Sequence, residues 1–197
     1  MAVIDYYLFP ISPFTYLAGT KLEQIAARHG ANIIYKPFNL MKVFEATGTP
    51  PLPQRHESRK AYRLAEIARI AQANDLPVNP HPAHFPTNPV PAAGAIIAAQ
   101  EAGGGDVGAL TYSLLRACWA EDRDIADDQV IHDCLTSAGF APDLADKGML
   151  SAVETYERNT QDALDALVFG APTYVVNGQV FWGQDRLDYL DRYLASL

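Results

Sequence analysis

The residues best placed to do chemistry are Ser12-Pro13-Phe14-Thr15, at the turn between two predicted elements. Val3 to Phe9 is rich in β-branched and aromatic residues, which is typical of a buried strand, and a helical pattern begins at Tyr16. We expect Ser12 to be the N-cap of this helix and Pro13 to hold its first position. A hydroxyl here can hydrogen-bond an anion. The Cys-x-x-Cys of a disulfide-exchanging enzyme is missing from this turn, so any reactive sulfur must belong to a ligand.

Two segments near the end of the chain suit the binding of a peptide-like ligand. In Gly170-Ala171-Pro172-Thr173, the proline is either a tolerated residue at the start of a strand or a cis-proline. A cis bend would leave the N–H and C=O of Ala171 free to pair with an extended ligand. In Gly183-Gln184-Asp185-Arg186, Asp185 either complements the helix dipole or pairs with an amino group, while the helix N-terminus binds a carboxylate.

The elements that must position these segments lie at the two ends of the chain. Residues 3–9, 13–29 and 32–36 predict strand, helix and strand, and hence two adjacent parallel strands with a right-handed crossover. Strand signals return at 173–182, where Asn177-Gly178 predicts a two-residue hairpin turn. A last helix is expected from Gln184 to Leu197.

The middle of the chain has a different character. From about residue 59 to residue 168 the apolar periodicity is helical, and the proline-rich span from Pro77 to Pro91 is expected to be a rigid surface connection. We therefore predict an α/β fold with a discontinuous domain formed by residues 1–58 and 169–197 and an inserted helical domain formed by residues 59–168. The cleft between the two is the expected ligand site.

Composition excludes several classes of function. The net charge of −8 argues against nucleic-acid binding, which requires a basic surface. No run approaches the roughly 20 apolar residues of a membrane span, and the N-terminal segment does not resemble a signal peptide. We expect a cytoplasmic protein with neither nucleic acid nor membrane as a partner.

Cysteines and histidines offer no strong site. Cys118 and Cys134 form no Cys-x-x-Cys pair, and we expect both to be buried, reduced thiols. His81 and His84 have a spacing that suits a metal, but they lie among prolines with no third ligand nearby. We expect a loop there and no metal site.

Taken together, the motifs resemble those of the 2-hydroxychromene-2-carboxylate isomerases, which are relatives of the kappa-class glutathione transferases in the wider DsbA-like group. The resemblance covers essentially the whole chain. It implies a thioredoxin-like domain with an all-helical insertion, glutathione as the cofactor in the cleft, a small aromatic carboxylate as substrate, and a homodimer. The segments that carry it are Asp5-Tyr6-Tyr7, Ser12 to Ala18, Trp119, Val168 to Thr173 and Phe181 to Leu187.

The resemblance also implies roles for individual residues. Ser12 corresponds to the active-site serine. Ala171, through its backbone beside cis-Pro172, and Gln184 and Asp185, at the γ-glutamyl group, are expected to bind glutathione. The basic residue at the start of the first inserted helix is Arg59 or Lys60, and the sequence leaves that choice open.

Three positions depart from the family pattern. Thr49 stands where asparagine is frequent, so one polar contact to glutathione is in doubt; Phe9-Pro10 replaces an acidic-aromatic pair, and Glu66 stands where aspartate is usual. We therefore expect the choice of substrate to differ within the family.

The implied activity is glutathione-dependent cis–trans isomerisation of 2-hydroxychromene-2-carboxylate and trans-o-hydroxybenzylidenepyruvate-type compounds in aromatic hydrocarbon degradation. A thiolate stabilised by Ser12 would add to a conjugated double bond, allow rotation and leave again. The basic residues Arg55, Arg59, Lys60 and Arg63 are candidates to pair with the substrate carboxylate, although a solvated surface is the simpler interpretation of Arg55 and Arg63.

Two alternatives stay open at this point. The first is a kappa-class-like glutathione transferase or peroxidase, which needs the same thiolate. The second is a non-catalytic peptide-binding thioredoxin-like module, since a bend at Ala171 can pair with any extended chain.

Overall fold

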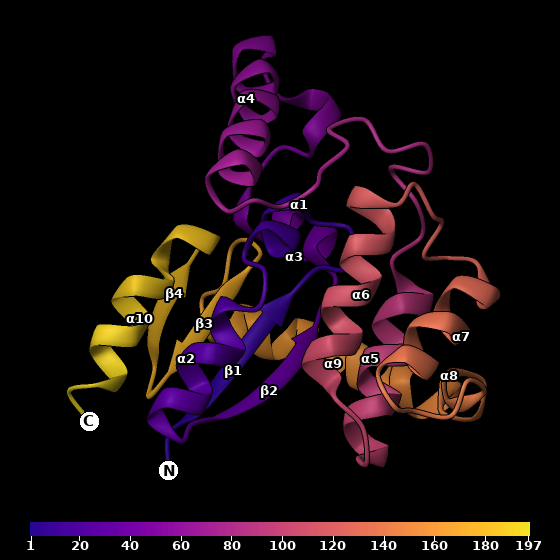
Figure 1. The fold of residues 1–197 in the computed structure, drawn as a ribbon. Coiled ribbons are helices and arrows are strands. Elements are labelled where there is room, and N and C mark those ends of the chain that lie inside the picture. Colours follow the sequence, from indigo (N-terminus) through magenta and orange to yellow (C-terminus); the bar gives the residue numbers. More distant parts are fainter.

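A computed structural model describes residues 1–197 and contains one four-stranded sheet (Figure 1). β1 (Val3–Leu8) is parallel to β2 (Asn32–Pro37) and antiparallel to β3 (Thr173–Val176). β4 (Gln179–Trp182) pairs antiparallel with β3, so the order across the sheet is β2-β1-β3-β4. The α/β prediction, with strands at both ends of the chain and helices between them, is confirmed.

The C-terminal hairpin forms where the sequence predicts it. Val176 pairs with Gln179 across a two-residue turn, and the turn residues Asn177 and Gly178 have φ values of 50° and 78°. Positive φ at both positions defines the type I′ turn, whose twist matches that of the flanking strands.

The first helix is shorter than predicted. A single helix over residues 13–29 is wrong, because the chain forms α1 (Pro13–Leu17) and α2 (Lys21–His29) with a break between them. Gly19 lies in the break with a φ of 59°, a left-handed conformation that a helix cannot contain. Ser12 therefore begins a helix of only five residues, whose dipole is weak.

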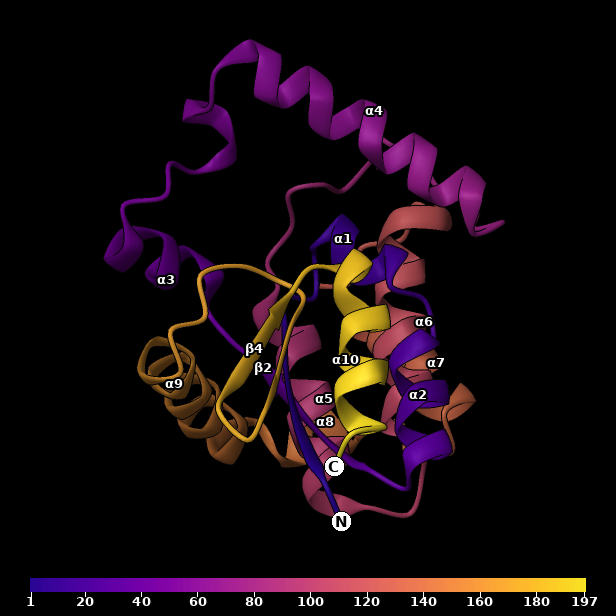
Figure 2. The ribbon, with the colours of Figure 1, turned by 90° about the vertical axis from the view of Figure 1, so that its left-hand side faces the viewer.

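The last helix also begins later than predicted. Gln184–Arg186 forms a 3₁₀ turn, and α10 covers Leu187–Leu194. α2 and α10 lie on one side of the sheet and α9 on the other (Figure 2).

Helices fill the middle of the chain, and no regular element occurs from residue 74 to residue 89, where the prolines concentrate. None of the helices is both long enough and apolar enough to cross a membrane. The remaining elements are α3 (Leu40–Thr47), a 3₁₀ turn at Leu52–Gln54, α4 (Glu57–Ala73), α5 (Val90–Ala102), α6 (Val107–Ala120), α7 (Asp128–Ser137), α8 (Leu144–Lys147) and α9 (Met149–Asp165).

The inserted helices are bonded to the edge strand β2. The side-chain amide of Gln100, in α5, accepts from the N–H of Tyr35 at 2.7 Å and donates to the C=O of Tyr35 at 3.1 Å. An edge strand otherwise presents unpaired backbone groups. The Gln100 amide provides the donor and the acceptor that a neighbouring strand would supply. A single cluster of 43 buried apolar residues includes side chains from both segments, and the domain boundaries at 58/59 and 168/169 stay a prediction.

α4 is attached much less firmly than the other long helices. Of its 17 residues only Ile67 and Ala71 are buried. It packs against α1 and lies across the end of the molecule above that helix in both views (Figures 1 and 2).

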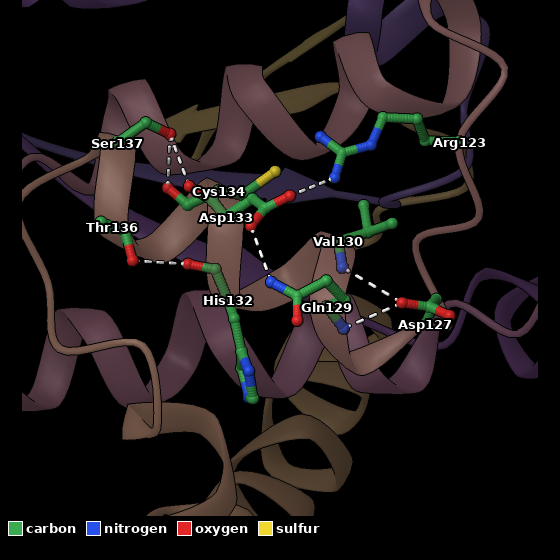
Figure 3. Close-up of polar contacts among 9 residues, drawn as sticks. All are labelled: Arg123, Asp127, Gln129, Val130, His132, Asp133, Cys134, Thr136 and Ser137. Atoms are coloured by element: carbon green, nitrogen blue, oxygen red, sulfur yellow. Dashed lines mark hydrogen bonds and ion pairs between the residues drawn. The ribbon is translucent and has the colours of Figure 1, made fainter.

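α7 shows how local polar contacts fix a helix (Figure 3). The carboxylate of Asp127 accepts from the N–H groups of Gln129 and Val130 at 2.8 and 3.2 Å and so caps the helix. One turn beyond Gln129, the carboxylate of Asp133 accepts from Arg123 and from the side chain of Gln129. These bonds hold the helix that contains the buried Cys134.

Both cysteines are free and buried, in agreement with the sequence prediction. Cys118 is 1% exposed and Cys134 is 2% exposed. Burial raises the pKa of Cys118 to about 12 and also raises the pKa of Cys134, because a thiolate is poorly solvated in an apolar interior.

We expect neither thiol to react in the folded protein. Iodoacetamide at mildly alkaline pH, followed by mass spectrometry of peptides, is expected to leave both cysteines unmodified, because almost no thiolate forms and neither sulfur is accessible. Addition of guanidinium chloride is expected to expose both to alkylation. Rapid modification of either cysteine without denaturant would contradict this assignment.

We expect Gln100→Ala to destabilise the fold by about 1–3 kcal/mol, because the N–H and C=O of the buried Tyr35 lose their partners. Gln72→Ala is the matched control, since Gln72 is exposed on α4. Chemical unfolding monitored by circular dichroism measures both. Equal midpoints for the two variants would show that the edge of β2 does not depend on this amide.

Candidate active site

Ser12 is the N-cap of α1, as predicted. Its backbone is extended, with φ −82° and ψ 123°, and its Oγ accepts from the N–H of Thr15 at 3.3 Å. Pro13 holds the first helical position. The Ser12 residue is 7% exposed, so its hydroxyl lies in a largely dehydrated place.

The Ser12 hydroxyl also faces the second predicted segment. Its Oγ donates to the C=O of Ala171 at 3.4 Å, across 159 residues of chain, and the Ala171–Pro172 peptide bond is cis. Hydroxyl donors in proteins normally lie 2.7–2.8 Å from their acceptor. The bond to Ala171 is therefore weak, and the hydroxyl proton can turn toward a stronger acceptor.

Other polar groups around Ser12 have no partner within the chain. The N–H groups of Phe14 and Ala171 donate to no acceptor, and the Oγ1 of the buried Thr15 has no hydrogen bond. Unpaired backbone donors near the surface of a protein are a means of holding an anionic or peptide-like ligand. The unpaired N–H groups suit the backbone of a peptide-like ligand, and the Ser12 hydroxyl suits an anionic sulfur on it.

The Gly183-Gln184-Asp185 segment is joined to the same bend. The N–H of Gly183 donates to the C=O of Pro172 at 2.9 Å, and α1 packs against the following 3₁₀ turn. The structure thus brings Ser12, Ala171 and Pro172 together with Gln184 and Asp185. Asp185 has a partner that the sequence prediction did not include, since Arg186 Nη1 lies 2.6 Å from its Oδ2.

The other predicted glutathione-binding residues lie on a separate segment. The hydroxyl of Thr49 contacts that of Thr47 at 3.1 Å, and Lys60 forms an ion pair with Glu57 at 2.8 Å. Arg59 is exposed and has no carboxylate within 4 Å. No hydrogen bond or ion pair links these residues to Ser12 or Ala171, although α4 contacts α1. Their roles stay a prediction.

Comparisons with known proteins identify the family of the chain. The DSBA-like thioredoxin domain matches residues 3–195. A 2-hydroxychromene-2-carboxylate isomerase from Sphingobium xenophagum is 30% identical over 196 residues, covering 98% of both chains. The chain belongs to this isomerase family. A second enzyme of that name, from Pseudomonas putida, is 30% identical over 200 residues, covering 99% of this chain and 95% of its own.

The fold is that of the same isomerase family. The solved structure of a 2-hydroxychromene-2-carboxylate isomerase has a TM-score of 0.80 at 24% identity, covering 98% of this chain and 95% of its own. A cytosolic disulfide reductase, DsbM from Pseudomonas aeruginosa, solved with GSH, has a TM-score of 0.70 at 18% identity over 98% of both chains. The predicted thioredoxin-like fold and the suspected family are both confirmed.

In this member of the isomerase family, two of the arginines considered for the substrate carboxylate lie over aromatic rings. The guanidinium carbon of Arg55 lies 5.3 Å from the ring centre of Phe44, and that of Arg63 lies 5.7 Å from the ring centre of Phe85. Burial lowers the pKa of both arginines, and each is half-buried. The interpretation of Arg55 and Arg63 as fully solvated surface residues is therefore wrong.

Sequence reasoning also missed an aromatic pair beside the cis bond. The rings of Phe169 and Trp182 meet edge to face with centres 4.7 Å apart, and they are 43% and 49% exposed. They flank Gly170, where an added Cβ would lie 2.3 Å from Trp182 Nε1. The only sequence signal for this pair was the glycine between Phe169 and Ala171.

A hollow also lies away from Ser12, beside α2 and β2. It has a volume of about 510 Å³ and is lined by Glu23, Tyr35 and Asp106, among others. The hydroxyl of Tyr35 donates to Glu23 at 2.9 Å, and burial raises the pKa of Glu23. None of the residues around Ser12 lines this hollow, so its size is not evidence for a catalytic role.

We expect Gly170→Ala to displace Trp182, because the added methyl group cannot fit beside the indole. The tryptophan emission should shift as the indole moves. If the ring stays packed, overpacking should destabilise the fold by about 1–3 kcal/mol. Gly94→Ala is the control, since its Cβ would meet only Ala152 Cβ at 3.7 Å. Unchanged emission in Gly170→Ala would contradict the packing described here.

Proposed function

We propose that this protein is a glutathione-dependent cis–trans isomerase that interconverts 2-hydroxychromene-2-carboxylate and trans-o-hydroxybenzylidenepyruvate-type compounds, within aromatic hydrocarbon degradation. The names of the relatives at 30% identity support the reaction. The observation that carries the proposal is the weak 3.4 Å contact of the Ser12 hydroxyl with Ala171, beside unpaired N–H groups.

Glutathione is proposed as the cofactor on three grounds. A relative from Caenorhabditis elegans is named glutathione S-transferase kappa 1 and is 24% identical over 196 residues, covering 93% of this chain and 86% of its own. A neighbour in fold was solved with GSH. The third ground is the set of unpaired donors around Ser12. When bound, glutathione supplies a thiol that adds reversibly to a conjugated double bond, which permits rotation, and then leaves unchanged.

The arrangement of the bend supports the proposed binding residues. The backbone of Ala171 pairs with the tripeptide backbone, and Gln184 and Asp185 bind the γ-glutamyl end. Arg186 already neutralises Asp185, so the ligand's amino group shares that carboxylate. Arg59 or Lys60, with Thr49, binds the far end of the tripeptide from α4 and the segment before it.

Ser12 keeps the sulfur ionised. A free thiol has a pKa of about 8.5, so little thiolate exists at neutral pH. A hydrogen bond from a hydroxyl to a charged group contributes about 1.5–3 kcal/mol, and one pKa unit corresponds to about 1.36 kcal/mol. Because α1 has only five residues, the dipole adds no more than about 0.3 kcal/mol, and Ser12 provides most of the effect. The thiol pKa then falls to about 7, after some loss to desolvation.

We also propose that the protein is a cytoplasmic homodimer. The compartment is supported by two buried cysteines that remain unpaired, which is usual where thiols are kept reduced. The dimer rests on the family resemblance.

The kappa-class relative favours a second candidate, a glutathione transferase that joins the sulfur permanently to an electrophile. The two activities differ in whether glutathione is consumed. Incubation with glutathione and either a chromene carboxylate or an aryl halide distinguishes them, since isomerisation converts the first without loss of thiol. Peptide binding without glutathione binding would instead favour the non-catalytic module.

We expect Ser12→Ala to lower the isomerisation rate about 10- to 100-fold at neutral pH, because the lost hydrogen bond raises the thiol pKa. Loss of the N-cap should cost only about 0.5–2 kcal/mol of stability, so the variant should fold. The assay follows cis–trans conversion by absorbance and total glutathione by thiol titration.

Ser12→Thr is the control for this experiment, since it retains a hydroxyl and a capping oxygen. It should keep more activity than Ser12→Ala. An unchanged rate in Ser12→Ala would remove the serine from the mechanism.

A further inference from the structure

A second hollow lies between α4 and the proline-rich segment that follows it. It has a volume of about 300 Å³, and no acidic residue lines it. The lining combines basic side chains with apolar ones, among them Lys60, Arg63, His81, Leu64, Pro82 and Phe85. A protein with a net charge of −8 thus has a hollow whose charged side chains, Lys60 and Arg63, are both cationic.

Arg63 is the cation of this hollow that has no partner. No carboxylate lies within 4 Å of it, whereas Lys60 pairs with Glu57, and Arg69, two turns along α4, pairs with Glu66. Its guanidinium carbon lies 5.7 Å from the ring centre of Phe85 and 5.9 Å from that of Trp119. The two rings are themselves 5.0 Å apart, so the guanidinium is held against an aromatic wall.

This combination suits one class of ligand. A guanidinium presents two parallel N–H donors that match a carboxylate, and an aromatic wall favours an aromatic ring. A volume of about 300 Å³ is at the small end of ligand pockets and fits one aromatic ring with a short acid chain. An inorganic anion would leave the apolar part of the lining without a contact.

The two segments that border the hollow both contact α1, the helix that Ser12 caps. The hydroxyl of Tyr16, in α1, donates to the C=O of Pro77 at 2.5 Å, three residues before Pro80 in the hollow's lining. α4 packs against α1 and lies above it in both views (Figures 1 and 2). The same helix thus borders the hollow and covers the end of the molecule at which Ser12 lies.

We propose that this hollow binds the aromatic carboxylate substrate, with Arg63 pairing with its carboxylate and Phe85 packing against its ring. The inference rests on the proposed function and assigns the pairing with the organic acid to Arg63. Arg63 selects the organic acid, whereas Arg59 or Lys60 serves the tripeptide.

The test is direct binding without glutathione. The probe is 3-phenylpropanoate, an aromatic acid with no conjugated double bond, titrated by calorimetry and by the emission of Trp119 in a Trp182→Phe background. We expect Arg63→Gln to weaken its affinity about 10- to 100-fold, Arg63→Lys to weaken it less, and Arg69→Gln to leave it unchanged. The affinity for glutathione should be the same in all four proteins, and circular dichroism checks that each is folded.

Two further probes sharpen the result. 3-Phenylpropan-1-ol, which lacks the carboxylate, should bind wild type and Arg63→Gln alike, and inorganic phosphate should bind much more weakly than the aromatic acid. Equal affinity of wild type and Arg63→Gln for 3-phenylpropanoate, or no binding to wild type, would overturn the assignment. Loss of glutathione affinity alone in Arg63→Gln would overturn it too. Because no turnover is involved, these outcomes are independent of whether the isomerisation assay succeeds.

Discussion

The pairing of β1 with β3 is the constraint on which the site depends. The two strands are antiparallel, and Tyr7 pairs with Thr173, so the end of β1 lies beside the start of β3. The turn after β1 and the bend before β3 therefore lie at the same end of these two central strands. Ser12 and Ala171, which are 159 residues apart in the chain, come into contact only for this reason.

The weakness of that contact has a chemical meaning. A strong intramolecular bond would keep the Ser12 proton directed at Ala171, whereas a bond of 3.4 Å competes poorly with an anionic acceptor. Because α1 has only five residues, its dipole stabilises an anion weakly, and stabilisation of the sulfur depends mainly on the Ser12 hydroxyl. α4 contributes in a different way. Only two of its 17 residues are buried, so its polar side chains are free to contact ligands.

Local rules predicted the features that local interactions determine. Pro13 after Ser12 indicated the helix cap, and Asn177-Gly178 indicated the hairpin, because in each case the conformation is fixed within four residues. The break at Gly19 was missed, since apolar residues continue the helical period across it. The same holds for the 3₁₀ turn at Gln184, whose geometry depends on the Gly183 bond to Pro172.

Contacts between distant segments could not be predicted in this way. Phe85, in the proline-rich segment, and Trp119, in α6, both lie against Arg63 of α4, and nothing in the spacing of these residues indicates that contact. Local motifs indicated Ser12, Ala171 and Gln184, the family resemblance gave them roles, and the sheet brings them together. The resemblance also supplied Thr49 and Arg59, whose positions on the α3–α4 segment leave their roles as predictions.

The central claim is that the Ser12 hydroxyl stabilises an anionic sulfur beside Ala171. The most direct measurement is an ultraviolet titration of the glutathione thiolate bound to the protein, in wild type and in Ser12→Ala. The account predicts a bound-thiol pKa of about 7 in wild type and a value about 1–2 units higher in Ser12→Ala. A bound thiol that titrates near the free value of about 8.5 in both proteins would contradict it.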